Sequence, residues 1–133
     1  MEETIQRLRD LNDSISLPLD LPTEDELVIV EEEILIPIPY DFRQYLLMAS
    51  DVVYGSLEPA TAADPKLHTH LPEMCAYAWD IGLPREYIPI CAYDGGYACI
   101  AEDGGIQFWR DELIDDKQWP DMWRWIEEVW LVR

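Results

Sequence analysis

Two Asp-Gly-Gly triplets, at residues 94–96 and 103–105, constrain the fold of this chain more than any other feature. Asp-Gly supplies the positive backbone φ angles that a tight hairpin turn needs. β-branched and aromatic residues flank the triplets, so we expect antiparallel strands over residues 87–93, 97–101 and 106–109. Pro89 lacks a backbone N–H, which favours a free edge beside it. The sequence therefore predicts an antiparallel β-meander.

Helical periodicity appears on both sides of this meander. Thr23 and Glu26 have the spacing of a capping box, Pro39 suits a helical first turn, and Gly82 suits a helix end. We expect helices over residues 2–12, 24–34, 40–49, 71–81 and 119–131. In the last of these, one face carries Trp119, Met122, Trp123, Ile126 and Trp130, which leaves Trp125 pointing elsewhere.

The remaining segments complete a single α+β domain. Residues 52–55 are β-branched and aromatic, which predicts a further strand, whereas the two prolines of 58–66 indicate a loop. Residues 17–22 form an extended, proline-containing linker. We therefore expect one domain over residues 1–133, with an N-terminal helix and linker (1–22). Helices should pack mainly on one face of an antiparallel β-meander sheet.

The charge balance excludes some classes of partner. The chain has 133 residues with 28 acids against 9 bases, which gives a net charge of -19 spread over both halves. Long-range repulsion disfavours nucleic acid and anionic membranes, while a cationic partner would be attracted. A surface this acidic also serves solubility alone, so the charge by itself does not choose between these two readings.

The cysteines and the N-terminus indicate a cytoplasmic protein. Cys75, Cys91 and Cys99 lie among apolar residues without a CxxC motif, so we expect buried free thiols in a reducing compartment. Met1 is followed by Glu2 and Glu3, which does not suit a secretory signal. No apolar run reaches the roughly 20 residues of a membrane span.

Motifs for catalysis are missing from the sequence. There is no nucleophile elbow, P-loop or dinucleotide fingerprint. His68 and His70, with Asp64 or Cys75, would be the best candidates for a metal site, but two histidines alone do not make one. Paired carboxylates such as Asp115 and Asp116 would serve a hydrolase, yet pairs arise by chance among 28 acids. We expect no enzyme, no cofactor and no metal.

Aromatic residues beside carboxylates suggest an interface with another protein. Tyr93, Tyr97, Phe108 and Trp109 gather around the meander, and most of such rings belong to a core. Rings left exposed would anchor a partner, with acids at the rim; Trp125 is the best candidate for an exposed ring. The predicted contact residues are Asp51, Tyr93, Asp94, Tyr97, Trp109, Asp111, Glu112 and Trp125.

The order of four segments resembles the SUKH superfamily of the Smi/Knr type, over about residues 23–131. Pro39-Tyr40-Asp41-Phe42-Arg43 and the residues after it are similar to that family's "LP-x-D-(Y/F)-R" helix start. Tyr87-Ile88-Pro89-Ile90 resembles its "LIPI" strand, with residues 94–100 as its hairpin. Residues 106–109 resemble its "V-x-F-W" strand, and Met122-Trp123-Arg124-Trp125-Ile126 occupies the place of its closing helix.

The chain departs from the family pattern at two surface positions. The helix at Tyr40 ends in Ala49-Ser50-Asp51 rather than Asn-Gly-Gly. Arg110-Asp111-Glu112 replaces the Asp-His-Glu that often follows the "V-x-F-W" strand, so any role that needs the histidine is in doubt here. Both changes concern the identity of a partner more than the fold.

The resemblance implies a non-enzymatic role. Bacterial members of the superfamily are immunity proteins that bind and neutralise toxin domains, often nucleases or deaminases, whereas fungal relatives are scaffolds or regulators of cell-wall glucan synthesis and signalling. We expect an immunity protein that binds a cognate toxin stoichiometrically, with the scaffold or regulator as the alternative. This is an argument by analogy, and it leaves the oligomeric state open.

Overall fold

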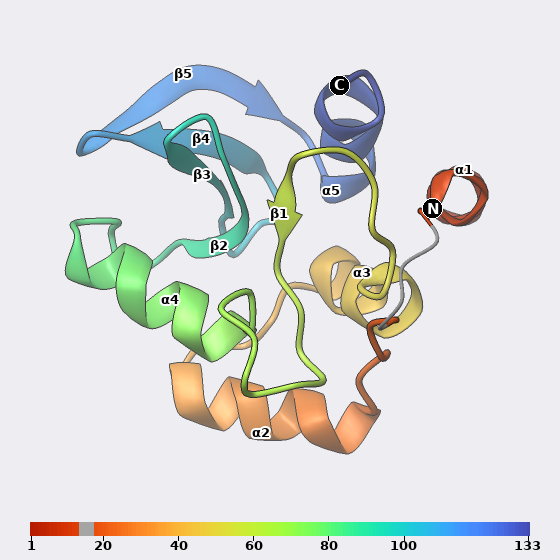
Figure 1. Ribbon diagram of the computed structural model, residues 1–133. Coiled ribbons are helices and arrows are strands. Elements are labelled where there is room, and N and C mark those ends of the chain that lie inside the picture. The colour runs from red at the N-terminus through yellow and green to blue at the C-terminus, as the bar shows by residue number, and fades with distance from the viewer. Residues whose placement is uncertain (14–17) are drawn as a thin grey trace.

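The computed structural model describes residues 1–13 and 18–133, and it contains an α+β domain (Figure 1). The expected linker over 17–22 therefore lies partly outside the described residues, and its described part, 18–22, has no regular secondary structure. In chain order the elements are α1 (Glu2–Leu11), α2 (Glu24–Ile34), α3 (Tyr40–Ala49), β1 (Glu58–Pro59), α4 (Leu71–Asp80), β2 (Ile88–Tyr93), β3 (Gly96–Ile100), β4 (Ile106–Arg110), β5 (Leu113–Trp119), α5 (Met122–Trp125) and the π-helix η1 (Ile126–Trp130).

The strands form one antiparallel sheet in the order β1-β2-β3-β4-β5. The three central strands match the meander that the Asp-Gly-Gly triplets predict. β1 pairs only with Cys91 and Ala92, and the β2–β3 register shifts between Pro89 and Cys91. Pro89 therefore lies beyond the stretch of β2 that pairs with β1, where its missing N–H leaves no ladder hydrogen bond unmade.

The main hydrophobic core lies between one face of the sheet and the helices. All five α-helices and η1 contribute buried side chains to it, and they pack against Ile88, Cys91, Ala98, Ile100 and Ile106. A smaller cluster lies on the other face, where Ala78 and Leu83, at the end of α4 and just beyond it, cover Cys99 and Trp109. This layering confirms the α+β class, with most helices on one face (Figure 1).

The helix signals of the sequence correspond closely to the structure. Thr23 Oγ1 accepts from Glu26 N at 3.1 Å while Glu26 Oε1 accepts from Thr23 N at 3.0 Å, which is the predicted capping box. α1 is fastened by Arg9, whose guanidinium donates to Asp51 Oδ2 at 2.9 Å and to the Met48 carbonyl at 2.7 Å. Ile5 and Leu8 bury the other side of this helix.

The expectation of a strand over residues 52–55 is wrong. The backbone of Val53 bonds to the segment after α1 instead: its N–H donates to Asn12 Oδ1 at 2.8 Å and its carbonyl accepts from Asp13 N at 2.7 Å. The Tyr54 carbonyl accepts from the indole of Trp130 at 3.0 Å. These partners satisfy the backbone, so the segment joins no sheet.

Two strands were not expected from the sequence. β1 falls inside the predicted loop over 58–66 and is only two residues long. β5 occupies residues that include the expected start of the last helix, so Trp119 ends a strand instead of opening a helix. The helix begins after Asp121, whose carboxylate caps it by accepting from Arg124 N at 2.8 Å.

Candidate functional site

Two hairpin tips lie side by side at one end of the sheet. Asp94 and Gly95 connect β2 to β3 with φ angles of 48° and 76°, and Asp111 and Glu112 connect β4 to β5 with φ angles of 51° and 66°. Arg110 joins the tips, because its Nη1 donates to the Asp94 carbonyl at 3.3 Å. Three predicted acids, Asp94, Asp111 and Glu112, are thus gathered at one end of the molecule.

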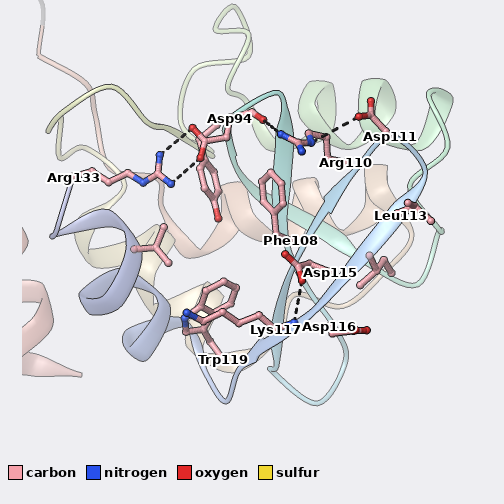
Figure 2. A pocket seen from close by; sticks show the side chains of 13 residues that line it. Asp94, Phe108, Arg110, Asp111, Leu113, Asp115, Asp116, Lys117, Trp119 and Arg133 are labelled. Carbon is pink, nitrogen blue, oxygen red and sulfur yellow. Dashed lines mark hydrogen bonds and ion pairs between the residues drawn. The ribbon is translucent and has the colours of Figure 1, made fainter.

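A large bulge in β5 opens a hollow behind these tips. Gln107 pairs with Gln118, and Trp109 pairs with Ile114, so a single residue of β4, Phe108, faces three residues of β5. Asp115, Asp116 and Lys117 form this bulge and leave Phe108 without a regular cross-strand partner. The resulting hollow has a volume of about 670 Å³. Figure 2 shows it with Phe108 near its centre.

The floor of the hollow is aromatic and its rim is charged. Tyr93 and Phe108 lie with ring centroids 4.9 Å apart, Trp119 closes the lower end, and Val129 of η1 adds to the wall. Exposed charges of both signs surround this floor, and Leu113 stands out at the rim with 74% of its surface exposed. The charged rim residues are Asp94, Arg110, Asp111, Asp115, Asp116, Lys117 and Arg133.

The pair of Asp94 and Arg133 ties the chain end to the β2–β3 tip. Arg133 Nη2 and Nη1 donate to the two carboxylate oxygens at 2.7 and 3.0 Å (Figure 2). This two-point hydrogen bond lowers the pKa of Asp94 and raises that of Arg133. Asp94 is therefore ionised and held in place, with the Arg133 guanidinium also 5.0 Å from the Tyr93 ring centroid.

Tyr93 and Tyr97 lie on opposite faces of the sheet. Tyr93 faces the hollow, where burial raises the pKa of its phenol and the Trp125 indole donates to its oxygen at 3.4 Å. Tyr97 stacks beside Trp109 on the other face with ring centroids 6.5 Å apart. A smaller hollow of about 410 Å³ lies on that face, lined by Ile81, Gly95, Trp109, Asp111 and Glu112.

The expectation that Trp125 is an exposed ring is wrong. Trp125 is fully buried, at 0% exposure, because the chain enters a π-helix after it and the buried face becomes Met122, Trp125, Ile126, Val129 and Trp130. Trp123, expected on the inner face, is only half-buried. Trp109 is also a core residue at 3% exposure, so its ring packs inside the smaller cluster and is not available on the surface for a partner.

Asp51 lies apart from the hairpin tips and from both hollows. It follows α3, and its carboxylate is occupied by Arg9 at 2.8 Å. This ion pair links α1 to the end of α3 and therefore stabilises the fold. Of the eight predicted contact residues, five therefore remain on the surface near the hairpin tips: Tyr93, Asp94, Tyr97, Asp111 and Glu112.

Sequence reasoning missed most of the hollow itself. It treated Asp115 and Asp116 as one acidic pair among many and assigned Trp119 to a helix. Ile81, an exposed residue just after α4 that lines the smaller hollow, was not singled out either. Residues 113–119 do not alternate between apolar and polar side chains, so the sequence carries no strand signal here; charged residues are typical of an exposed edge strand.

Reactive groups are scarce over residues 1–13 and 18–133. These residues include no group of three or more His, Cys, Asp or Glu side chains placed to hold a metal ion. The three cysteines are free and buried, as expected, and burial raises the pKa of Cys75 and of Cys99 to about 12. Such thiols stay protonated and are poor nucleophiles.

None of the described helices combines the length and apolarity that crossing a bilayer requires.

The fold and these hollows define a class of protein: a small acidic α+β domain with two surface hollows beside its hairpin tips. A family model described as SUKH_5, SMI1-KNR4 cell-wall, matches residues 1–131, and the chain belongs to this family. The match confirms the resemblance drawn from the sequence. This family consists in general of immunity or regulatory modules that bind proteins and are not enzymes.

A solved structure has the same fold. The chain is similar to a protein from Pseudomonas syringae pv. tomato known from its crystal structure, with 50% sequence identity, a TM-score of 0.96 and full coverage of both chains. A search of curated proteins gave no match.

Proposed function

We propose that this chain is a non-enzymatic immunity protein that acts in the cytoplasm and neutralises a cognate toxin by stoichiometric binding. The observation that carries the proposal is the gathering of Asp94, Asp111 and Glu112 at two adjacent hairpin tips, beside a hollow with an aromatic floor. Aromatic groups at the centre and charges at the rim are the composition of a protein interface. Membership in the SUKH_5 family supports protein binding in general.

The charge supports a cationic partner. A nuclease must attract phosphate, so its active face is cationic. A protein with a net charge of -19 is steered toward such a face, and the exposed acids Asp111 and Glu112 project from the β4–β5 tip. Blocking the active face or a neighbouring exosite of a nuclease-type toxin would suffice for neutralisation.

A non-enzymatic role is supported by the state of the reactive groups. The buried thiols are protonated, and His68 is exposed in a loop, where its Nε2 lies 3.1 Å from a carboxylate oxygen of Glu58. His70 lies apart from it as a buried residue at the start of α4. The reduced state of three buried cysteines agrees with a cytoplasmic location.

The direct test is a tagged pull-down from a lysate of the source organism, washed first at low and then at high salt. We expect a stoichiometric basic protein that is lost or weakened at high salt, and its identity would name the class of toxin. Recovery of only a neutral or acidic partner that resists salt would contradict the immunity function.

The alternative is a scaffold or regulator that binds a cellular protein, and the cell-wall description of the matching family favours it. It requires no cationic partner. Gene neighbourhood separates the two candidates cheaply, because a toxin gene directly upstream favours immunity and an isolated gene favours the scaffold.

A further inference from the structure

The protein's own cations already lie over two of the three aromatic rings in the large hollow. The Arg133 guanidinium is 5.0 Å from the centroid of Tyr93, and Lys117 Nζ is 5.2 Å from that of Trp119. A cation over a ring face is attracted by the ring quadrupole. The third ring, Phe108, is half-buried, and no cation of the described residues lies over it. It is the uncovered ring of the hollow.

Carboxylates without cationic partners stand next to this ring. Asp94 pairs with Arg133, and Asp111 lies 3.8 Å from Arg110. Asp115 and Asp116 are exposed on the bulge, and neither forms an ion pair within residues 1–13 and 18–133. Figure 2 shows Asp115 directly beside Phe108. The uncovered ring and the unneutralised carboxylate of Asp115 therefore lie together, and Asp116 follows on the same bulge and lines the same hollow.

We propose that this hollow receives an arginine side chain of the partner, with its guanidinium stacked on Phe108 and its N–H donors facing Asp115 and Asp116. The inference rests on the proposed protein-binding function and specifies its anchor. Arginine suits the site better than lysine, because a planar guanidinium stacks on a ring and carries five donors for two carboxylates. A volume of about 670 Å³ exceeds what one side chain needs, so neighbouring backbone of the partner also fits.

The free edge of β5 is a less suitable docking point than the hollow. A partner strand would have to pair along Leu113–Trp119, but the three-residue bulge interrupts the line of backbone donors and acceptors there. Asp115 Oδ1 also accepts from Lys117 N at 3.3 Å, which occupies one of those donors. Bulges and edge lysines are common devices against strand addition.

The test uses N-acetyl-arginine amide as the probe and the full chain as the receptor. Chemical shifts of the protein are followed by NMR during titration up to about 50 mM, a range suited to millimolar affinity. We expect saturable shifts at Phe108, Asp115, Asp116 and Lys117. N-acetyl-citrulline amide has nearly the same shape without the charge, and we expect no saturable shift with it. Equal responses to both probes, or no response to arginine, would overturn the inference.

Two variants locate the effect. Phe108→Leu removes the ring, and the double change Asp115→Asn with Asp116→Asn removes the charges while keeping the side-chain oxygen that accepts from Lys117 N. Each should weaken binding of the arginine probe roughly fivefold to tenfold. Glu32→Gln with Glu33→Gln, on the exposed side of α2, is the matched control and should bind as the native chain does. The inference fails if the hollow variants bind the probe with native affinity.

Failure of the inference is distinguishable from failure of the proposed function. If the hollow variants capture the basic partner as well as the native chain does, the proposed function stands and the arginine anchor is wrong. If the arginine probe binds as expected but the pull-down yields no basic partner, the arginine site is supported and the proposed neutralisation of a basic toxin is wrong.

Discussion

Among the glycines, Gly96 is the one with the least room for a side chain. A Cβ added there would collide with the Trp109 carbonyl oxygen and would lie 2.7 Å from Phe108 Cζ and 2.9 Å from Arg110 Cβ. The glycine thus allows β3 and β4 to approach closely just behind the two hairpin tips. Both the adjacency of the tips and the placement of Phe108 depend on it.

Replacing Gly96 with alanine should therefore destabilise the protein by about 2–4 kcal/mol, because backbone and aromatic atoms must move together. Urea unfolding followed by tryptophan fluorescence measures this change. Gly105→Ala is the control, since its Cβ would meet Asp103 Oδ1 at 3.2 Å, which can move, and we expect a change below about 1 kcal/mol. Equal losses in both variants would contradict the close approach at Gly96.

His70 makes stability depend on pH. It is buried before α4 with Nδ1 lacking a hydrogen-bond partner, and burial lowers its pKa below the ordinary value, although carboxylates of Glu26, Glu33, Asp64 and Glu73 act in the opposite direction. The folded state prefers the neutral ring. The stability that this preference supplies is complete above a pH of about 6.5 and is lost as the pH falls through the folded-state pKa.

His70→Gln should remove that part of the pH dependence. Between pH values of about 7.5 and 5, the native chain should lose more free energy of unfolding than the variant. His68→Gln, at the exposed histidine two residues earlier, should retain the native dependence. The account of His70 is wrong if both variants follow the native curve.

Among the elements, the helices were the most predictable from sequence and the edge strands the least. Capping box, proline and periodicity placed α2, α3 and α4 within a residue or so of their bounds, because these signals are local. β5 was not predicted, because its turn is Asp111-Glu112, without the glycine that marks the other two hairpins. Its charged edge sequence also lacks the alternation of apolar and polar residues that indicates a strand. The hollow is formed by the bulge of β5, so the sequence did not predict the hollow either.

The closing helix shows a different limit. Its register was predicted from a helix that begins at Trp119, whereas the structure begins it after Asp121 and continues it as a π-helix. That change moved Trp125 from the expected surface to the core. Which tryptophan is buried depends on where β5 ends, and no local pattern shows this.

The β4–β5 turn combines backbone strain with exposed charge. Glu112 has a φ of 66°, a region that costs a non-glycine residue about 1–2 kcal/mol. Glu112→Gly should therefore raise the free energy of unfolding by about 0.5–1 kcal/mol. Glu112→Gln removes the same charge and keeps the strain, so it should leave stability nearly unchanged. Equal stability of the two variants in urea unfolding would show that the turn is not strained.

At the scale of the whole molecule, the net charge of -19 is spread along the chain. Among the acids at the two hairpin tips, Asp94 pairs with Arg133, whereas Asp111 and Glu112 are exposed on the β4–β5 tip. The α2 helix carries the exposed acids Glu32 and Glu33 on a different part of the molecule (Figure 1). If electrostatic steering guides the partner to the hairpin tips, Asp111 and Glu112 should affect the association rate more than Glu32 and Glu33 do.

The most direct test is the association rate with the captured partner, measured by stopped flow over a range of salt. Asp111→Lys with Glu112→Lys and Glu32→Lys with Glu33→Lys change the net charge equally. We predict that the tip variant associates roughly tenfold more slowly at low salt, with a flatter salt dependence, and that the α2 variant stays close to native. Equal rates for the two variants would contradict recognition through the hairpin tips.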